Sequence, residues 1–338
     1  MRAPRFWWRG PGSGRRASDA FSPSLSPFLL APLAALYGWE ARRRLRRAAP
    51  RGPLPVLCVG NPTVGGVGKT PLALALARAA IGMGRKPGFL SRGYGGRGGG
   101  LVARGDRASE VGDEPLLLAE AAPVWVGADR AGGAEGLARI GCDLLIMDDG
   151  FQSRRLRPDL ALLLVDGARG LGNGRVLPAG PLRAPFDAQL ALADGLVVVE
   201  TGRGRDGADG AVAGARARGV EVLTARIAPE NGGDFQGRPV VAASGLGDPD
   251  RFVAMLEACG ARVVARRDFP DHHPFTDQDV AALRALAAAH GAPVVTTAKD
   301  AVRLDGRLPH EVLRITATLE DDAAARLVAA TLARHGGP

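Results

Sequence analysis

The sequence predicts an α/β protein in which a mostly parallel sheet with helices on both faces is followed by a second, smaller α/β domain. Three observations support this class. Short runs rich in Val, Leu and Ile alternate with Ala-rich stretches along most of the chain, as in parallel α/β sheets. The first buried-strand run, residues 54–60, leads directly into a glycine-rich loop and a helix. A polar, Gly-rich piece at residues 201–219 interrupts the alternation before a second set of elements begins.

The glycine-rich loop has the features of a phosphate-binding loop. Gly65, Gly66 and Gly68 allow positive φ angles, so that successive backbone N–H groups and the start of the next helix point at phosphate oxygens. Lys69 is placed to reach the β- and γ-phosphates of a nucleotide, and the Thr70 hydroxyl to bind Mg²⁺. The expected ATP-binding residues are Thr63, Val64, Gly65, Gly66, Val67, Gly68, Lys69 and Thr70.

The helix after this loop, residues 71–80, is rich in strong helix formers and supplies the positive dipole end that such a loop needs. The strict P-loop pattern, G-x-x-x-x-G-K-[ST], has Gly where this chain has Thr63. The alternative is an ordinary glycine-rich turn between a strand and a helix. Because strand, loop and helix occur in the required order, we expect a P-loop NTPase-like sheet.

Further elements follow in the same alternating pattern. The first set is expected to contain strands at residues 87–90, 123–126, 143–148, 160–165 and 196–200, and helices at 114–122, 129–139 and 187–193. The second set is expected to contain strands at 222–227, 239–244, 263–264, 293–297 and 312–315, and helices at 249–259, 277–290 and 319–334. We therefore expect an N-terminal segment (1–50), a P-loop domain (51–230) and a smaller α/β domain (231–338).

Composition agrees with a chain of about two domains, since 46% of the 338 residues are hydrophobic. The net charge of +9 would suit nucleic acid or an anionic membrane surface. Lys occurs only at positions 69, 86 and 299, which together with abundant Ala and Gly indicates a GC-rich genome, and we expect no nucleic-acid partner. Because this composition favours Arg over Lys, we expect the remaining Lys residues where an ammonium point charge is needed in place of a guanidinium group. Three cysteines without CxxC spacing are expected to be buried in a reducing compartment: Cys58, Cys142 and Cys259.

The N-terminal segment has an uncharged run at residues 20–39, followed by a basic cluster at 42–47. Prolines interrupt this run, so we expect a short helix in the membrane interface rather than a spanning one, with Tyr37 and Trp39 at headgroup level. The alternatives are a cleavable signal peptide and a helix that packs on the core of the protein. Residues 1–19 are expected to be disordered or loosely bound to the surface.

A second acidic motif accompanies the loop. Residues 143–149 form an apolar run that ends in Asp148 and Asp149, as a Walker B segment does when it presents a carboxylate to Mg²⁺. Alone, a strand that ends in Asp-Asp-Gly is more often a turn. Its pairing with the loop favours a metal site made by Thr70 and one of the two aspartates, Asp148 or Asp149.

Three loops offer further polar groups. Asp113 stands at a helix start, where it is expected to be a functional carboxylate, an N-cap or both. Arg92 follows a strand directly, at the end where α/β sheets bind ligands, and could clamp an anionic group. Residues 271–274, Asp-His-His-Pro, are either a solvated turn or a place where a carboxylate orients a histidine as proton acceptor.

Taken together, the motifs resemble those of the tetraacyldisaccharide 4′-kinase family, from about residue 33 to the last helix. The ordered set of motifs is more specific than any one of them, and this family also has Thr at position 63. It usually has Glu where this chain has Ala184 and Ala298. The matching stretches are residues 60–71, 90–96, 111–115, 148–152, 172–174, 177–183, 269–272 and 296–300.

The resemblance implies transfer of the ATP γ-phosphoryl group to the 4′-hydroxyl of an acylated glucosamine disaccharide 1-phosphate, forming lipid IVA in lipid A biosynthesis. Lys69 and Thr70 would act with Mg²⁺, while Asp113 and His272 would form a base dyad that assembles when the domains close. The enzyme would lie on the cytoplasmic face of the inner membrane, as a peripheral or monotopic protein without an obligate protein partner. The expected substrate contacts are Arg92, Tyr94, Asn173 and Arg183.

Two other function classes remain as alternatives. A membrane-associated P-loop ATPase or GTPase switch would have no small-molecule acceptor. Such ATPases usually carry a second Lys where this chain has Val64, and no guanine-reading N-K-x-D run is present. A protein that holds nucleotide without turnover would leave the loops of Asp113 and His272 unexplained.

Overall fold

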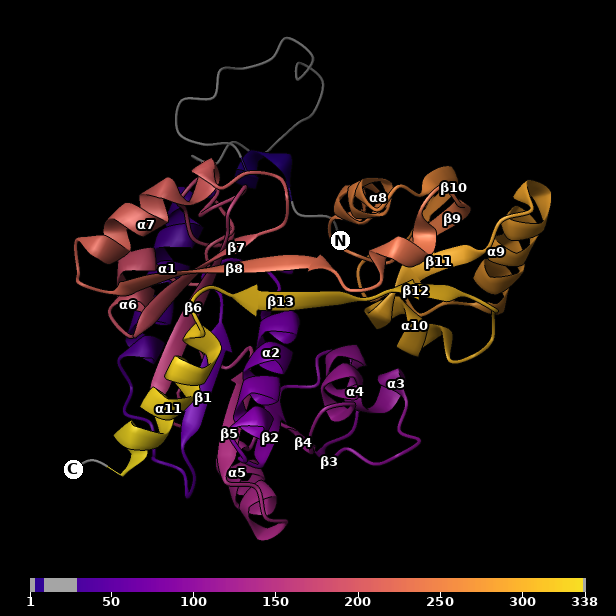
Figure 1. Cartoon of the computed structure of the whole chain (residues 1–338). Helices are drawn as coiled ribbons and strands as arrows, with labels where there is room; N and C mark the ends of the chain where they lie inside the picture. Colours follow the sequence, from indigo (N-terminus) through magenta and orange to yellow (C-terminus); the bar gives the residue numbers. More distant parts are fainter. Residues whose placement is uncertain (1–3, 9–28, 337–338) are drawn as a thin grey trace.

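A computed structural model describes residues 4–8 and 29–336 and contains two sheets (Figure 1). The larger sheet has nine strands in the order β13-β8-β7-β6-β1-β5-β2-β4-β3. All its neighbouring strands are parallel except the edge pairs β3·β4 and β13·β8, which confirms the expected mostly parallel sheet. The strands are β1 Val56–Gly60, β2 Pro87–Ser91, β3 Gly100–Leu101, β4 Val124–Val126, β5 Leu144–Asp148, β6 Leu160–Asp166, β7 Gly195–Glu200, β8 Glu221–Pro229 and β13 Ile315–Leu319.

Helices cover both faces of this sheet. On β1, Leu57 and Val59 face one apolar cluster, whereas Val56 and Cys58 face the other, because successive side chains of a strand point to opposite faces. The first cluster is covered by α2 Lys69–Gly82, α3 Ala108–Val111, α4 Asp113–Ala119 and α11 Ala323–His335, and the second by α5 Arg130–Arg139, α6 Phe186–Leu190 and α7 Asp209–Arg216. We call this sheet with its helices the large lobe.

The smaller sheet has four parallel strands in the order β10-β9-β11-β12. Its faces are covered by α8 on one side and by α9 and α10 on the other. We call these elements, between residues 230 and 314, the small lobe. They are β9 Pro239–Ser244, α8 Pro249–Ala258, β10 Arg262–Asp268, α9 Asp277–His290, β11 Val294–Thr297, α10 Ala298–Leu304 and β12 Glu311–Leu313.

The chain does not stay in the small lobe, as the expected domain of residues 231–338 would require. The expected strand at 312–315 is divided between β12, in the small sheet, and β13, which pairs antiparallel with β8 in the large one. The last helix starts at Ala323, and α11 packs on α2 and β1. In Figure 1, β8 and β13 are therefore the two strands that lead from one lobe to the other.

Besides the four-residue α3, two helices lie where the sequence predicted none. The polar piece at 201–219 contains α7, whose Ala211 and Ala215 are buried against the sheet. Small alanines gave no apolar periodicity that could be recognised in the sequence. The second helix is α10, which begins after Thr297, whose side chain accepts a hydrogen bond from the backbone of Asp300. It has only 7 residues, too few for a helical period to be read.

The N-terminal helix α1 spans Ala31–Leu45 and packs on the large lobe through Ala34, Gly38 and Leu45. Arg42 forms a two-fold hydrogen bond with Asp187 of α6 at 3.0 Å. Within residues 4–8 and 29–336, no helix is both long and apolar enough to span a membrane. A short 3-10 helix, Arg5–Trp8, also lies on the large lobe. The rest of residues 1–19, and the first part of the uncharged run, lie outside the described residues.

Candidate active site

The glycine loop follows the central strand β1, where the register of the sheet places it beside the end of β5. Gly65 and Gly68 have φ angles of 102° and 94°, which only glycine adopts readily. A β-carbon on Gly68 would lie 2.1 Å from Ile227 Cδ1, so this position also requires close packing. At Gly65 and Gly66, by contrast, a β-carbon would meet nothing within 4 Å. These two glycines therefore line open space of the kind that a phosphate chain needs.

The chain between residues 176 and 183 braces the loop from one side. The backbone N–H of Val64 donates to Pro181 at 2.9 Å, and Thr63 forms a β-bridge with Leu182. Thr63 is 3% exposed, and its carbonyl accepts hydrogen bonds from Asn61 at 2.6 Å and from Arg183 at 3.0 Å. Thr63 is not among the residues with positive φ. An extended, paired residue does not need to be glycine, which explains the departure from the strict P-loop pattern.

Lys69, at the start of α2, points back across the loop. Its ammonium donates to Asn61 Oδ1 at 3.0 Å and lies 3.6 Å from Asp149. Burial lowers the pKa of Lys69. Burial raises the pKa of Asp149, but Lys69 and Arg183 outweigh it and hold that pKa below its usual value. Arg183 donates to Asp149 at 2.8 Å, so Arg183 lies beside the glycine loop.

Thr70 and Asp148 form a pair of oxygens that fits Mg²⁺. Asp148 ends β5 opposite Val59 of β1, and the Thr70 hydroxyl donates to Asp148 Oδ2 at 3.1 Å. The other carboxylate oxygen of Asp148 is buried and has no hydrogen-bond partner among the described residues. Burial raises the pKa of Asp148, which a divalent cation would reverse. Of the two candidate aspartates, Asp148 has the unpartnered oxygen, whereas Asp149 is held by two cations.

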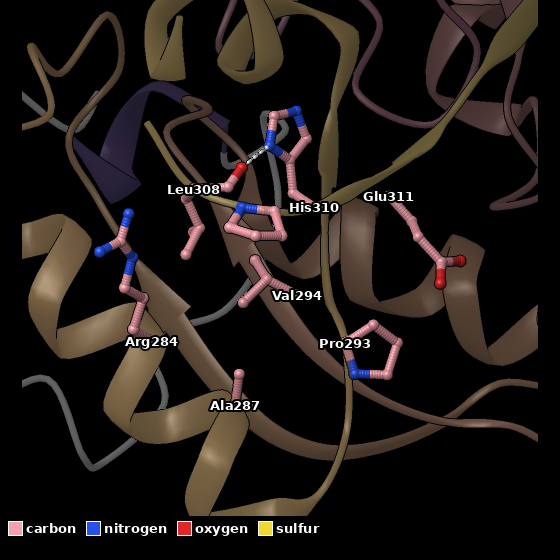
Figure 2. A pocket seen from close by; sticks show the side chains of 8 residues that line it. Arg284, Ala287, Pro293, Val294, Leu308, His310 and Glu311 are labelled. Atoms are coloured by element: carbon pink, nitrogen blue, oxygen red, sulfur yellow. Dashed lines mark hydrogen bonds between the residues drawn. The ribbon is translucent and has the colours of Figure 1, made fainter. Parts of the chain in front are cut away.

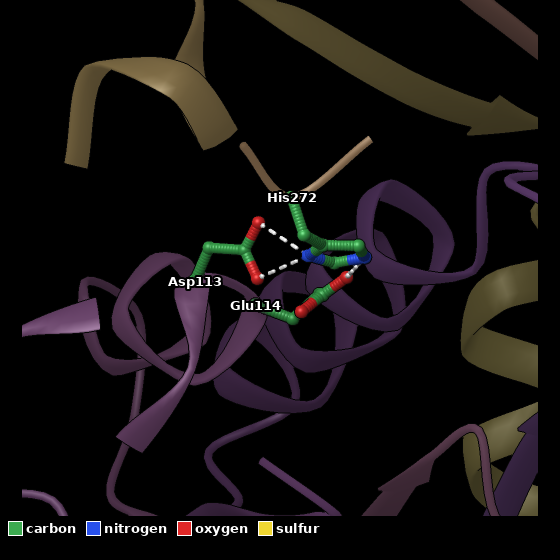
Figure 3. A group of neighbouring side chains, drawn as sticks. All are labelled: Asp113, Glu114 and His272. Carbon is green, nitrogen blue, oxygen red and sulfur yellow. Dashed lines mark hydrogen bonds and ion pairs between the residues drawn. The ribbon is translucent and has the colours of Figure 1, made fainter. Parts of the chain in front are cut away.

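A second cluster lies between the lobes (Figure 3). Asp113, in the first turn of α4, is 3% exposed, and Nδ1 of His272 lies 3.2 Å from its Oδ1 and 3.1 Å from its Oδ2. His272 comes from the loop before α9 and has a φ of 56°, a strained conformation of the kind that collects at functional sites. The side chain of Asp113 makes no capping hydrogen bond. The N-cap alternative is therefore wrong, because the carboxylate points at the small lobe instead.

The pair is polarised by its surroundings. The hydrogen bond to Asp113 raises the pKa of His272. Burial would raise the pKa of Asp113, but the hydrogen bond with His272 and the charge of Lys299 hold it well below its usual value. Arg303 lies 3.7 Å from Asp113 Oδ2 as well. We expected the two residues to meet only on closure of the domains, and the structure has them in contact.

The remaining candidates lie at different distances from this cluster. The ring of Tyr94 is 66% exposed, and its centre lies 5.2 Å from that of His272. Arg92 is exposed in the same loop. Asn173 donates to Ala179 at 2.9 Å and its backbone N–H donates to Trp7 at 2.7 Å. Tyr94 thus presents exposed surface beside the pair, whereas Asn173 holds its own loop together.

The small lobe also has a hollow of about 390 Å³ between α9 and β12 (Figure 2). Its polar side chains already have partners: Arg284 donates to Arg307, His310 contacts the carbonyl of Leu308 at 2.7 Å, and Glu311 pairs with Arg238. None of the residues of the glycine loop or of the interlobe cluster lines it. We assign it no role.

Sequence comparison identifies the family. A model described as tetraacyldisaccharide-1-P 4′-kinase matches residues 26–333. The chain belongs to this kinase family. It is 49% identical to the tetraacyldisaccharide 4′-kinase of Paramagnetospirillum magneticum over 97% of both chains, and 46% identical to that of a Methylobacterium species over 100% of both.

A solved structure agrees with membership of the tetraacyldisaccharide 4′-kinase family. The Aquifex aeolicus LpxK, described as an apo form in complex with ATP, is 27% identical, with a TM-score of 0.69 over 90% of this chain and 99% of that one. The chain is therefore an ATP-dependent kinase, and the switch ATPase and the binding protein without turnover are not supported.

Sequence reasoning missed three members of the interlobe cluster: Glu114 as an ion-pair partner, Lys299 and Arg303. A signal existed for Lys299, because it is one of three lysines kept in an Arg-rich chain. No signal existed for Arg303, which is one arginine among many. Its location at 8% exposure beside Asp113 depends on how the lobes meet.

Proposed function

We propose that this kinase transfers the γ-phosphoryl group of ATP to the 4′-hydroxyl of a tetraacyldisaccharide 1-phosphate, forming lipid IVA in lipid A biosynthesis. The proposal rests on the presence of two groups of residues in one molecule, one suited to bind phosphates and Mg²⁺ and the other suited to accept a proton. A phosphate-binding loop with a Thr70–Asp148 oxygen pair belongs to the large lobe, and the Asp113–His272 pair, which can take up a hydroxyl proton, joins the two lobes. Family membership supplies the identity of the acceptor.

On the nucleotide side, the loop and Lys69 would bind the phosphates, and Thr70 and Asp148 would hold Mg²⁺. The ion neutralises charge on the phosphate oxygens when it is bound. Phosphoryl transfer needs little from the protein beyond positioning and stabilisation of charge. Asp149 pairs with Lys69 and Arg183. It would hold the ammonium of Lys69 beside the loop until the phosphates of the nucleotide take the place of Asp149 as its partner.

On the acceptor side, the pair would take the proton of the 4′-hydroxyl. His272 is 25% exposed and Asp113 only 3%, so the hydroxyl reaches the imidazole more readily than the carboxylate. This favours a relay in which Nε2 of His272 takes the proton while Asp113 accepts the hydrogen bond from Nδ1. Tyr94 and Arg92 would contact the sugar and its phosphate near this point.

The acylated substrate would be met at the membrane. Three large apolar side chains of α1 point away from the protein: Leu33, Leu36 and Trp39 are 59%, 64% and 63% exposed. Arginines lie at the C-terminal end of the same helix. Such a surface suits insertion at the level of the headgroups with the arginines on anionic lipid. We propose a peripheral or monotopic location on the cytoplasmic face of the inner membrane.

The test is a transfer assay with γ-labelled ATP and a tetraacyldisaccharide 1-phosphate in mixed micelles. The expected result is a labelled lipid that depends on Mg²⁺ and carries the phosphate at the 4′ position. Hydrolysis of ATP at an unchanged rate without labelled lipid would contradict the proposed acceptor. A control without enzyme separates enzyme-dependent from spontaneous label transfer, and a chelator control tests the dependence on Mg²⁺.

A further inference from the structure

The helix α10 is a rigid support at the interface of the lobes. Both carboxylate oxygens of Asp300 lie 3.1 Å from the backbone nitrogen of Gly245, which follows β9. Asp300 also accepts a hydrogen bond from Thr297 at 2.6 Å and one from Arg303 at 2.5 Å. Asp300 is 0% exposed, so these bonds are well shielded from water. The side chains that α10 carries toward the large lobe are therefore held in place.

One of these side chains is Lys299, whose ammonium makes an ion pair with Glu114 Oε1 across the interface. Glu114 follows Asp113 in α4, and the same Oε1 lies 4.0 Å from Nε2 of His272. The imidazole thus lies between two carboxylates (Figure 3). Asp113 is hydrogen-bonded to Nδ1, whereas Glu114 stays beyond hydrogen-bond distance of Nε2.

The separation of Glu114 from Nε2 of His272 requires an explanation, because Glu114 has an oxygen that is free to accept a hydrogen bond. Its Oε2 is buried and has no hydrogen-bond partner among the described residues. A movement of about 1 Å would bring Oε1 into hydrogen-bond distance of Nε2. With both nitrogens bound to carboxylates, the imidazole would hold its two protons and could accept none. Lys299 is the cation that competes for Oε1.

We propose that Lys299 is a positioning residue that holds Glu114 away from Nε2 of His272 and so leaves this nitrogen open to the acceptor hydroxyl. The inference rests on the proton-accepting role proposed for the Asp113–His272 pair. The proposal explains the residues of the stretch 297–300. Thr297 and Asp300 fix the start of α10 through their hydrogen bonds, and Lys299 pairs with Glu114.

Other charged or polar groups face the pair and must be considered in any pH experiment. Burial raises the pKa of Glu114, the negative charge of Asp113 raises it further, and the charge and hydrogen bond of Lys299 act against that shift. Asp271 lies 3.8 Å from Nε2 but is 38% exposed, so it remains hydrated. The groups around the pair are Glu114 on α4, Asp271 in the loop of His272, Lys299, Asp300 and Arg303 on α10, and the Tyr94 ring.

The experiment compares Lys299→Met, Glu114→Gln and the double variant. In Lys299→Met the carboxylate of Glu114 moves to Nε2 and stabilises the imidazolium. We expect kcat to fall on the order of 10²-fold, within the range of general base catalysis, with the KM for ATP unchanged. The acid limb of the kcat profile should move to higher pH, and the pKa of His272, followed by imidazole NMR, should rise.

The double variant decides between the proposal and a direct role of Lys299 on phosphate. In Lys299→Met with Glu114→Gln the buried carboxylate of Glu114 is gone, the exposed Asp271 stays hydrated, and neither partner of the ion pair is left unpaired, so kcat should recover by at least about 10-fold over Lys299→Met. Lys299→Arg, which can keep the ion pair, should retain more activity than Lys299→Met. Lys86→Met is the matched control, because Lys86 is exposed at the start of β2, and its activity should equal that of the wild type.

A double variant as impaired as Lys299→Met, or an unchanged His272 pKa in Lys299→Met, would overturn the proposal. If Lys299→Met does not fold, as judged by its melting curve, the pKa of His272 in Lys299→Arg and the double variant supplies the same comparison. Failure of the proposed function is distinguishable. Active Asp113→Asn and His272→Ala enzymes would reject the proton-accepting pair itself, whereas the NMR measurement of the His272 pKa in the Lys299 variants does not depend on phosphoryl transfer.

Discussion

The two halves of the site are built in different ways. In the half proposed to bind the nucleotide, all residues come from the large lobe: Lys69 and Thr70 begin α2, Asp148 ends β5, and the parallel register of β1 and β5 brings them together. In the acceptor half, Asp113 and His272 are 159 residues apart and come from different lobes. The first half is therefore as rigid as the sheet, whereas the second exists only as long as the lobes keep their relative position.

The difference separates two tasks. Binding and neutralising phosphates requires fixed dipoles and charges, which a central strand and a helix terminus provide. Accepting a proton from a large lipid substrate requires a group that meets it from the opposite side, which a second lobe provides. Variants in the two halves should thus fail in different steps.

The largest effect is expected at the interlobe pair. Asp113→Asn should lower kcat by roughly 10²–10⁴ with little change in ATP affinity or melting temperature, because the carboxylate caps no helix. His272→Ala should cost a similar factor, and the double variant should be little worse than either one. Steady-state kinetics with isothermal titration of an ATP analogue measure both quantities.

The neighbour His273 is the control for that prediction. It pairs with Asp279 at 2.9 Å and stacks on Phe269, inside the small lobe. His273→Ala should affect stability more than turnover. Additive losses at Asp113 and His272, or an active Asp113→Asn enzyme, would reject the pair while leaving the kinase assignment intact.

The next effect is expected in the nucleotide half. Lys69→Ala and Thr70→Ala should each remove about 3 kcal/mol or more of transition-state stabilisation, roughly 10²–10³ in rate. Unlike Asp113→Asn, they should also weaken binding of the ATP–Mg²⁺ complex. Near-normal turnover in either variant would contradict the role given to this loop. Ala substitution of Arg78, exposed on the same helix, is the control.

A smaller effect is expected at the membrane surface. Replacement of Leu33, Leu36 and Trp39 by Ser removes the outward apolar face of α1 and leaves its buried face intact. The protein should no longer sediment with anionic vesicles, since each buried side chain of this size contributes about 1.5–3 kcal/mol. The KM for lipid should rise, with ATP binding unchanged. Unchanged sedimentation would indicate that α1 serves only to pack on the large lobe.

The smallest effect is a pH dependence of stability. The pKa of His272 is raised by Asp113, so its contribution is fully present below about pH 6.5, the unfolded value, and is lost as the pH rises through the folded value. The difference in melting temperature between wild type and His272→Ala should therefore be larger at pH 6 than at pH 9. An equal difference at both values would show that the pair does not carry the charge described here.

Residues close together in the chain could be predicted well. Gly65 to Thr70 follow a buried strand, and their spacing by itself indicates a phosphate-binding loop. Asp148 ends another buried strand. Parallel strands bring their carboxyl ends to one edge of a sheet, so the nucleotide half and the α/β class followed from local pattern alone. The ordered motifs also identified the family, and with it the partners Asp113 and His272.

Other features were decided by tertiary structure. The return of β13 to the large sheet depends on pairing with β8, nearly 90 residues earlier in the chain, and a short alternating run is equally suited to either sheet. The contact of Lys299 with Glu114 spans 185 residues. In the sequence Lys299 is only a charge, and in water such a charge is screened beyond about 8–10 Å. Only the contact between the two lobes determines that Lys299 pairs with Glu114. The same contact places this carboxylate 4.0 Å from Nε2 of His272.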